Sequence, residues 1–79
     1  MSTKAYVLIE VAVGKTKDVI TALQQVDGVR SVEAVTGPYD VIAIMEGKDI
    51  NSIGDLVTKG VHSISGISRT VTCLTVKLG

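Results

Sequence analysis

The 79-residue sequence contains no phenylalanine and no tryptophan, and its only aromatic residues are Tyr6 and Tyr39. It therefore lacks the aromatic platforms on which single-stranded nucleic acids stack. Lysine plus arginine and aspartate plus glutamate number eight each, so no excess of positive charge favours phosphate backbones or anionic membranes. We therefore expect neither direct nucleic-acid binding nor binding to a membrane.

Cysteine and long apolar runs are equally scarce. The single cysteine, Cys73, excludes a disulfide within the chain and agrees with a reducing compartment, so the cytoplasm is the expected location. The apolar stretch at residues 5–13 contains Glu10 and is too short to span a bilayer. His62 is the only histidine and has no cysteine at ligand spacing, which predicts that there is no metal site.

Valine and isoleucine are abundant, and their distribution divides the chain into two similar strand–helix–strand halves. Thr16 is expected to cap the first helix, which Gly28 ends, and Asp49 is expected to cap the second. No linker or low-complexity segment separates the halves, so residues 1–79 are predicted to form a single domain. The strands are expected at residues 5–13, 29–36, 41–45 and 67–77.

A βαββαβ order with right-handed crossovers gives the ferredoxin-like α+β fold, in which an antiparallel four-stranded sheet of order 4-1-3-2 carries two helices on one face. The first strand is apolar on both faces, with Tyr6 and Leu8 on one and Val7 and Ile9 on the other. Strands that are apolar on both faces are expected to be buried on both. Because the helices cover only one face, we predict that a second copy covers the other in a face-to-face homodimer.

Residues 36–40 (Thr-Gly-Pro-Tyr-Asp) collect more polar chemistry than any other short segment. They contain the only proline and lie between two apolar strands. A Gly-Pro pair stops a strand, and the tyrosine and aspartate after it place a hydroxyl, a carboxylate and free backbone N–H groups at one rim. Two interpretations stay open from these residues alone. The segment is either a ligand-recognition loop or a plain hairpin in which Asp40 accepts a bond from its own backbone.

Two segments of the chain resemble the effector-binding domain of the Lrp/AsnC (feast/famine) regulators, also called the RAM domain. They are Thr36-Gly-Pro-Tyr-Asp-Val-Ile-Ala and Val61-His-Ser-Ile-Ser-Gly-Ile-Ser-Arg-Thr-Val-Thr72. The resemblance covers essentially the whole chain and implies a dimeric α/β barrel, assembly of dimers into octamers or decamers, and an amino acid held where dimers meet. The site residues that it implies are Thr36, Gly37, Tyr39 and Asp40 in the loop and Thr70, Thr72 and Leu74 in the last strand.

The chain departs from full-length members of that family because it begins directly at the sheet, without their N-terminal helix-turn-helix. It resembles the stand-alone form of the domain. The resemblance then implies a module that senses an amino acid and modulates transcription regulation through its oligomeric assembly, without a cofactor. Mixed oligomers with a full-length Lrp/AsnC regulator, partnership with an enzyme and plain ligand sequestration all stay open as uses of the bound amino acid.

Other functions on the same fold also stay open. A small dimeric α+β barrel enzyme requires a general base or a reactive cofactor in its cavity, whereas His62 is expected on the helix side. An ACT-type amino-acid module usually places its ligand after the first strand, whereas the polar segment here follows the second. A structural assembly partner with an empty site is the remaining alternative. We predict a non-enzymatic, amino-acid-binding module with neither catalytic nor metal-binding residues.

Overall fold

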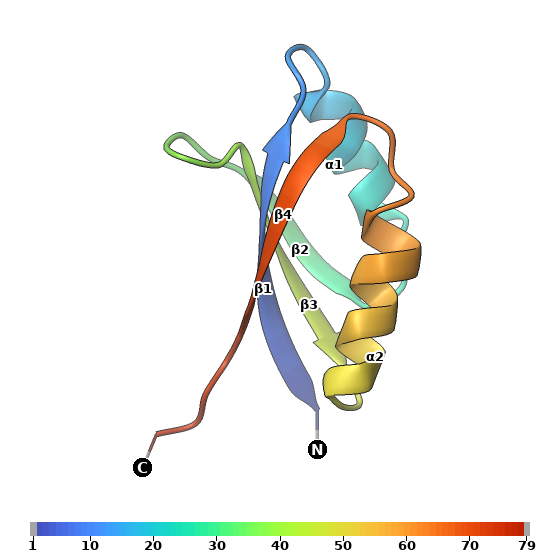
Figure 1. Ribbon diagram of the computed structural model, residues 1–79, viewed down its shortest axis with the longest axis vertical. Coiled ribbons are helices and arrows are strands. Elements are labelled where there is room, and N and C mark those ends of the chain that lie inside the picture. Colours follow the sequence, from blue (N-terminus) through green and yellow to red (C-terminus); the bar gives the residue numbers. More distant parts are fainter. Residues whose placement is uncertain (1, 79) are drawn as a thin grey trace.

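Four antiparallel strands form one sheet in the order β2-β3-β1-β4, and the helices cover one of its faces (Figure 1). This computed structural model describes residues 2–78. The ferredoxin-like α+β fold and the strand order expected from the sequence are confirmed. The elements are β1 (Thr3–Val11), α1 (Thr16–Gln24), β2 (Val29–Ala34), β3 (Val41–Gly47), α2 (Ile50–Asp55), a π-helical segment η1 (Leu56–Val61) and β4 (Ile67–Leu74).

The core lies between the helices and the two central strands. β1 and β3 pair along their length, from Thr3 opposite Gly47 to Ile9 opposite Val41. Successive side chains of a strand point to opposite faces, so every second residue of each strand faces the helices. On the central strands these helix-facing residues are buried. With the apolar positions of the helices they form the core, which consists of Ala5, Val7, Ile9, Val11, Val19, Leu23, Val41, Ala43, Met45, Ile53, Val57 and Val61.

The two helices begin differently. α1 begins at Thr16 itself, so the prediction that Thr16 caps it is wrong; Lys15 holds the N-cap position and makes no capping bond with its side chain. The prediction for Asp49 is confirmed, since its carboxylate accepts a bond of 2.8 Å from the Ser52 N–H. That bond favours the charged carboxylate and holds the pKa of Asp49 below its ordinary value.

The ends of the helices also differ from the sequence pattern. α1 ends at Gln24 rather than at Gly28, because Gln25 and Val26 close tight turns by donating to carbonyls three residues earlier. Gly28 does have the left-handed conformation, with a φ of 95°, but it leads into β2. After α2 the helix widens, and the His62 N–H donates to the Val57 carbonyl, five residues back, at 2.9 Å.

Three strands end earlier than the sequence pattern indicates: β1 at Val11 rather than at residue 13, β2 at Ala34 rather than at residue 36, and β4 at Leu74 rather than at residue 77. β1 stops at Val11 after a register shift between Glu10 and Val11, and Val13 beyond it is fully exposed. β4 stops at Leu74, which is opposite Ala5 near the start of β1. No helix among residues 2–78 has the length and apolar character needed to cross a bilayer.

The sheet face away from the helices is uncovered in the single chain and largely apolar. Leu8 lies at its centre, with Ile42 opposite it on β3 and Val71 opposite it on β4. Tyr6, Ile44 and the exposed Cys73 extend this surface along the strands. The inference that the central strands are apolar on both faces is therefore confirmed. Cover of this open face by a second copy stays a prediction.

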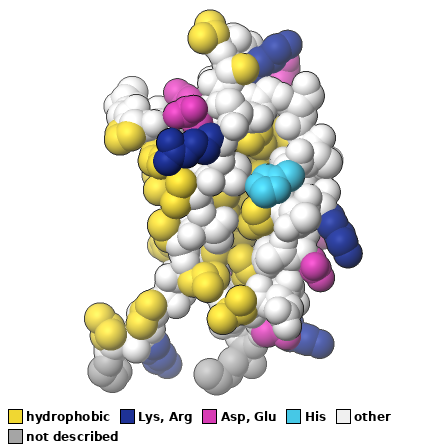
Figure 2. All heavy atoms as spheres, viewed as in Figure 1, with side chains coloured by type: hydrophobic (Ala, Val, Ile, Leu, Met, Phe, Trp, Pro, Cys, Tyr) yellow, Lys and Arg dark blue, Asp and Glu magenta, His cyan; other side chains and the backbone are white. Residues whose placement is uncertain are grey.

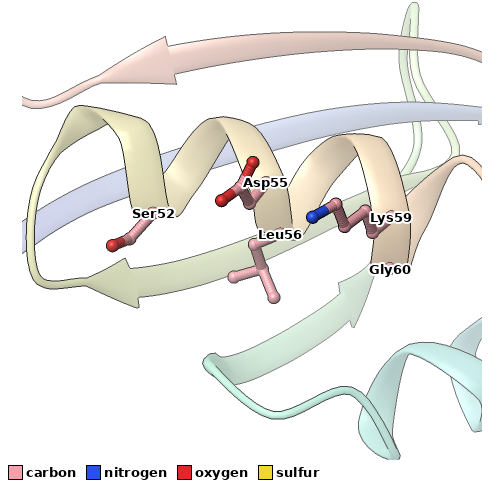
Figure 3. A pocket seen from close by; sticks show the side chains of 5 residues that line it. All are labelled: Ser52, Asp55, Leu56, Lys59 and Gly60. Atoms are coloured by element: carbon pink, nitrogen blue, oxygen red, sulfur yellow. The ribbon is translucent and has the colours of Figure 1, made fainter.

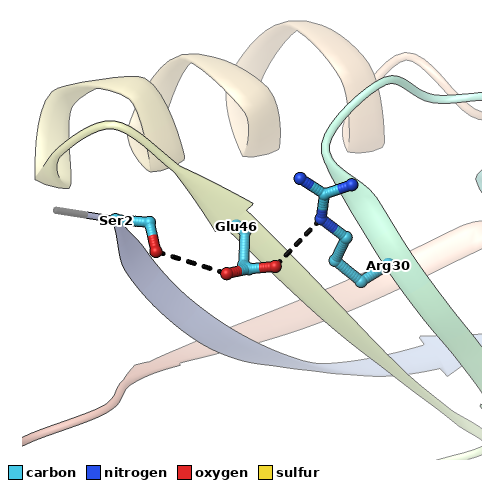
Figure 4. A network of polar contacts seen from close by, with 3 residues as sticks. All are labelled: Ser2, Arg30 and Glu46. Carbon is cyan, nitrogen blue, oxygen red and sulfur yellow. Dashed lines mark hydrogen bonds and ion pairs between the residues drawn. The ribbon is translucent and has the colours of Figure 1, made fainter.

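A small polar network bounds the open face at the far end of β3 (Figure 4). The Arg30 Nε donates to a Glu46 carboxylate oxygen at 2.9 Å, and the Ser2 hydroxyl donates to the other oxygen at 3.3 Å. The arginine and glutamate side chains are 65% and 36% exposed. An ion pair this exposed contributes little to stability, so we interpret the network as a solvated rim.

Candidate functional site

The loop between β2 and β3 is held firmly at its base. The Val35 N–H donates to the Asp40 carbonyl at 2.9 Å, which closes the loop, and the Asp40 N–H donates to the Ile9 carbonyl at 3.0 Å. Residues 36–39 project from this base beyond the sheet (Figure 1). Gly37 has a φ of 132°, a conformation that side-chain-bearing residues rarely adopt. The loop therefore exposes its backbone to solvent while hydrogen bonds hold its two ends in place.

Asp40 anchors the loop to a different strand. Its carboxylate oxygen Oδ2 accepts a bond of 2.9 Å from the Val11 N–H. Because β3 begins at Val41, opposite Ile9, the Val11 N–H lies beyond the last backbone partner on that side. The carboxylate supplies the acceptor that this N–H requires. The expectation that Asp40 accepts a bond from its own backbone is therefore wrong, and ligand binding by the loop stays a prediction.

Tyr39 extends from the loop to the beginning of β4. Its hydroxyl oxygen accepts a bond of 3.4 Å from Arg69 Nη2, and the guanidinium carbon lies 6.0 Å from the ring centroid. This is the geometry of a cation–π contact. Because the loop follows β2 and the predicted threonines lie on β4, at opposite edges of the sheet, the two are expected to meet only across subunits or around the rim. Within one chain the loop reaches the last strand at Arg69, whereas the predicted threonines face the helices and do not meet the loop.

The predicted residues of β4 lie on the other face of the sheet. Thr70 and Thr72 pair with Ile9 and Val7, whose side chains are in the core, so they face the helix layer. The Thr70 hydroxyl lies 3.1 Å from His62 Nε2. Thr72 lines a groove of about 280 Å³ between β4 and α2, and Figure 2 shows apolar side chains in the hollow beside the single histidine. The groove is lined by Ile50, Ile53, Gly54, Val57, Thr58, Thr72 and Leu74.

The seven predicted site residues thus form two groups that one chain does not bring together. The loop group projects from one end of the sheet, and the β4 group faces the helices along the groove. Arg69, which touches the loop group, has no place in the sequence prediction. The alternation of side chains along a strand was the available signal, since it places Arg69 on the face opposite to its neighbour Thr70.

A second hollow lies on the outer side of α2 and η1 (Figure 3). Its volume is about 470 Å³, and it is lined by Ser52, Asp55, Leu56, Lys59 and Gly60. None of these residues is fully buried, and the hollow opens broadly to solvent. It contains no buried polar group that would fix a ligand. Among residues 2–78, no three His, Cys, Asp or Glu side chains are grouped so that they can hold a metal ion.

Comparison with known proteins identifies similar domains. A family model described as the Lrp/AsnC ligand binding domain matches residues 4–78. A solved structure from Thermus thermophilus is 34% identical, with a TM-score of 0.91, and the match covers 98% of this chain and 96% of that one. AsnC of E. coli is 16% identical, with a TM-score of 0.90 over 96% of this chain and 52% of its own. A transcriptional regulator from Neisseria meningitidis, solved as a complex with L-Met, is 17% identical, with a TM-score of 0.84 over 95% of this chain and 50% of its own.

The chain therefore spans about half the length of these two regulators. Among curated proteins, a homocitrate synthase from Sulfurisphaera tokodaii is 31% identical over 62 residues. That match covers 78% of this chain but 13% of the synthase. The similarity concerns a small part of that enzyme, so its activity does not follow for this chain.

Proposed function

Because the chain belongs to the Lrp/AsnC ligand-binding domain family, we propose that it is a non-enzymatic module that binds an amino acid as effector. The match of the family model to residues 4–78 carries this proposal. The complex of the similar Neisseria meningitidis regulator with L-Met supports the choice of an amino acid over other small molecules.

The loop at residues 36–39 suits the charged end of such a ligand. The N–H groups of Gly37 and Tyr39 are available as donors for an α-carboxylate, whereas Pro38 has none. The backbone bonds of Val35 and Asp40 hold the loop in place without a ligand, and a loop that is already ordered loses less entropy when it binds. Thr36 adds a hydroxyl at the exposed start of the loop.

The groove between β4 and α2 suits the other end of the ligand. Ile50, Ile53, Val57 and Leu74 give it an apolar lining, and Thr72 adds a hydroxyl. Thr70 extends the polar side of the groove toward His62. Small-molecule sites commonly combine such an apolar wall with a few polar groups. Since the loop and the groove lie on different faces, a ligand touches both groups only where the loop of one copy approaches the groove of another.

The open face of the sheet provides a separate surface for pairing two copies. It is apolar around Leu8, Ile42 and Val71, as expected of a surface that is buried in an assembly. The grooves lie on the helix side, so dimers that join through the open face leave them free, while the loops project from the end of the sheet at the edge of the joined faces. We propose that the amino acid binds where a loop meets the groove of another dimer and that its binding changes how dimers assemble into octamers or decamers, which links occupancy to assembly.

The effect of amino-acid binding on transcription depends on which protein the oligomer binds. Family membership supports a role in transcription regulation, through oligomers with a full-length Lrp/AsnC regulator. In that arrangement the regulator binds DNA and this chain contributes amino-acid binding. Co-purification of this chain with such a regulator, in amounts that change when the amino acid is added, is the expected observation.

A thermal-shift screen of the twenty amino acids, combined with measurement of molecular mass, tests the proposal. A ligand that binds only the folded protein raises Tm, by an amount that grows with its concentration above Kd. We expect one amino acid, or a few related ones, to raise Tm and to change the distribution of oligomers. Absence of any shift at millimolar concentration for all twenty would contradict amino-acid binding.

A further inference from the structure

The guanidinium group of Arg69 makes one side-chain hydrogen bond within the described residues, to Tyr39. It stands near the beginning of β4, at the end of the sheet where the loop of residues 36–39 projects. We propose that Arg69 binds the α-carboxylate of the amino-acid ligand. This inference rests on the proposed function and adds to it the residue that recognises the charged end of the ligand.

Arg69 lacks the partner that an arginine at a structural site normally has. Among residues 2–78, the only ion pair within 4.0 Å joins Arg30 to Glu46, and Arg69 takes no part in it. The one side-chain bond of Arg69 is the 3.4 Å bond to the Tyr39 hydroxyl. A guanidinium has five N–H donors in a planar fork, so most of them remain free for a ligand. That fork matches the two oxygens of a carboxylate.

The contact with Tyr39 positions the guanidinium. The guanidinium carbon lies 6.0 Å from the centroid of the tyrosine ring, so the ring orients the charge without neutralising it. Because residues 35 and 40 anchor the loop, Tyr39 stands on a fixed base. A carboxylate with two oxygens can accept bonds from both Arg69 and the backbone N–H groups of the loop.

The charges around Arg69 favour a zwitterion over a simple anion. Glu10 is directly opposite Arg69 in the β1–β4 pairing, and its carboxylate is 3.4 Å from the Ser68 hydroxyl. Asp40 adds a second carboxylate at the same end of β1, on the Val11 N–H. Two carboxylates repel a phosphate or sulfate but attract an α-ammonium group. An amino acid carries both the charge that Arg69 attracts and the charge that its neighbours attract.

Calorimetric titration of the full chain and of Arg69→Gln tests the inference. Each of the twenty L-amino acids is titrated into the wild-type chain, and every one that binds is compared with its own α-amide, which lacks the carboxylate charge. We expect Arg69→Gln to weaken binding of the acid by about tenfold or more, as loss of a charge-assisted bond does. The amide should bind weakly to both proteins, so the variant should reduce the preference for acid over amide.

Three further variants make the result specific. Arg30→Gln removes an arginine that is exposed on β2 and paired with Glu46, and it should leave the affinity unchanged. Arg69→Lys keeps the charge without the fork and should give intermediate affinity. Tyr39→Phe keeps the ring but removes the hydroxyl that Arg69 contacts. It should therefore weaken binding less than Arg69→Gln does.

The outcomes separate the two proposals. If an amino acid binds the wild type and Arg69→Gln equally well, the role of Arg69 is overturned while the proposed function stands. If Arg69→Gln weakens acid and amide by the same factor, Arg69 only positions Tyr39 and the inference is again overturned. If none of the twenty amino acids binds the wild-type chain, the proposed function fails and the inference fails with it.

Discussion

At the scale of single residues, Asp40 has a structural role in addition to its proposed role in ligand binding. Its carboxylate binds the Val11 N–H at 2.9 Å, and its own N–H binds the Ile9 carbonyl. These bonds join the loop to the end of β1. A substitution at Asp40 therefore changes the loop as well as any direct contact with a ligand.

Asp40→Ala should lower the free energy of unfolding by about 1 kcal/mol, because it leaves the part-buried Val11 N–H without an acceptor. It should also weaken binding of an amino acid, by about 1–3 kcal/mol where the carboxylate contacts the ligand. Urea unfolding measures the first effect and calorimetry the second. Asp40→Asn retains an oxygen acceptor without the charge, so it should recover most of the stability. Wild-type stability in Asp40→Ala would show that the bond to Val11 contributes nothing.

The residues of the candidate site were only partly predictable. The loop was identifiable because glycine, proline, tyrosine and aspartate in sequence have few other uses between two strands. The contact between Tyr39 and Arg69 was not, because it joins positions 30 residues apart. It depends on the register of β4 on β1, which the turn chemistry of the loop does not determine. Alternation places the neighbours Thr70 and Arg69 on opposite faces, and the register of β4 on β1 decides which of the two faces the helices.

At the scale of elements, the order and type of strands and helices followed from the sequence, whereas their ends did not. Apolar periodicity reflects which face is buried, and that is a local property. A strand ends where its partner ends, which is a property of two distant segments. This explains why β1 stops at Val11, beyond which neither β3 nor β4 pairs with it, although the apolar pattern continues to Val13. Asp49 was predictable as a cap because its bond to Ser52 is local.

Gly66 joins two elements and gives a prediction at this scale. Its carbonyl accepts a bond of 2.8 Å from the Ala12 N–H, and it packs against the beginning of α1. A Cβ at this position would lie 3.0 Å from Lys15 Cβ and 3.2 Å from Val19 Cγ2. Gly14 also has a positive φ, 79° against 99° for Gly66, but a Cβ there would meet nothing within 4 Å.

Gly66→Ala and Gly14→Ala should both be destabilised by the strained backbone, by about 1–2 kcal/mol each. Gly66→Ala should lose about a further 1 kcal/mol or more, because its Cβ crowds the first turn of α1. Urea unfolding of the two variants beside the wild type provides the measurement. Equal stabilities of the two variants would mean that α1 moves away from β4 without cost, contrary to the close packing at Gly66.

At the scale of the whole molecule, a single chain has more apolar surface than its own elements can cover. The helices bury one side of the sheet, and Leu8, Ile42 and Val71 are left on the other. A chain of this size buries only about 60% of the surface that its unfolded form exposes. Association of copies is therefore expected to stabilise the fold and to form the site at the same time.

Leu8→Glu tests whether copies pair through the open face. Leu8 lies between Ile42 and Val71, so a glutamate there would place an unpaired charge at the centre of the open face, which the second copy is predicted to cover. We expect the wild type to sediment as a dimer or a larger assembly at micromolar concentration. The dissociation constant of the Leu8→Glu dimer should be about a hundredfold higher or more. Val13→Glu is the matched control, because Val13 is also an apolar residue but lies beyond β1, fully exposed. The open face is not the contact surface if the wild-type chain has the mass of a monomer. The same conclusion follows if the Leu8→Glu chain assembles as the wild type does. The loop and the groove would then need another route to one another, since within one chain they lie on opposite faces of the sheet.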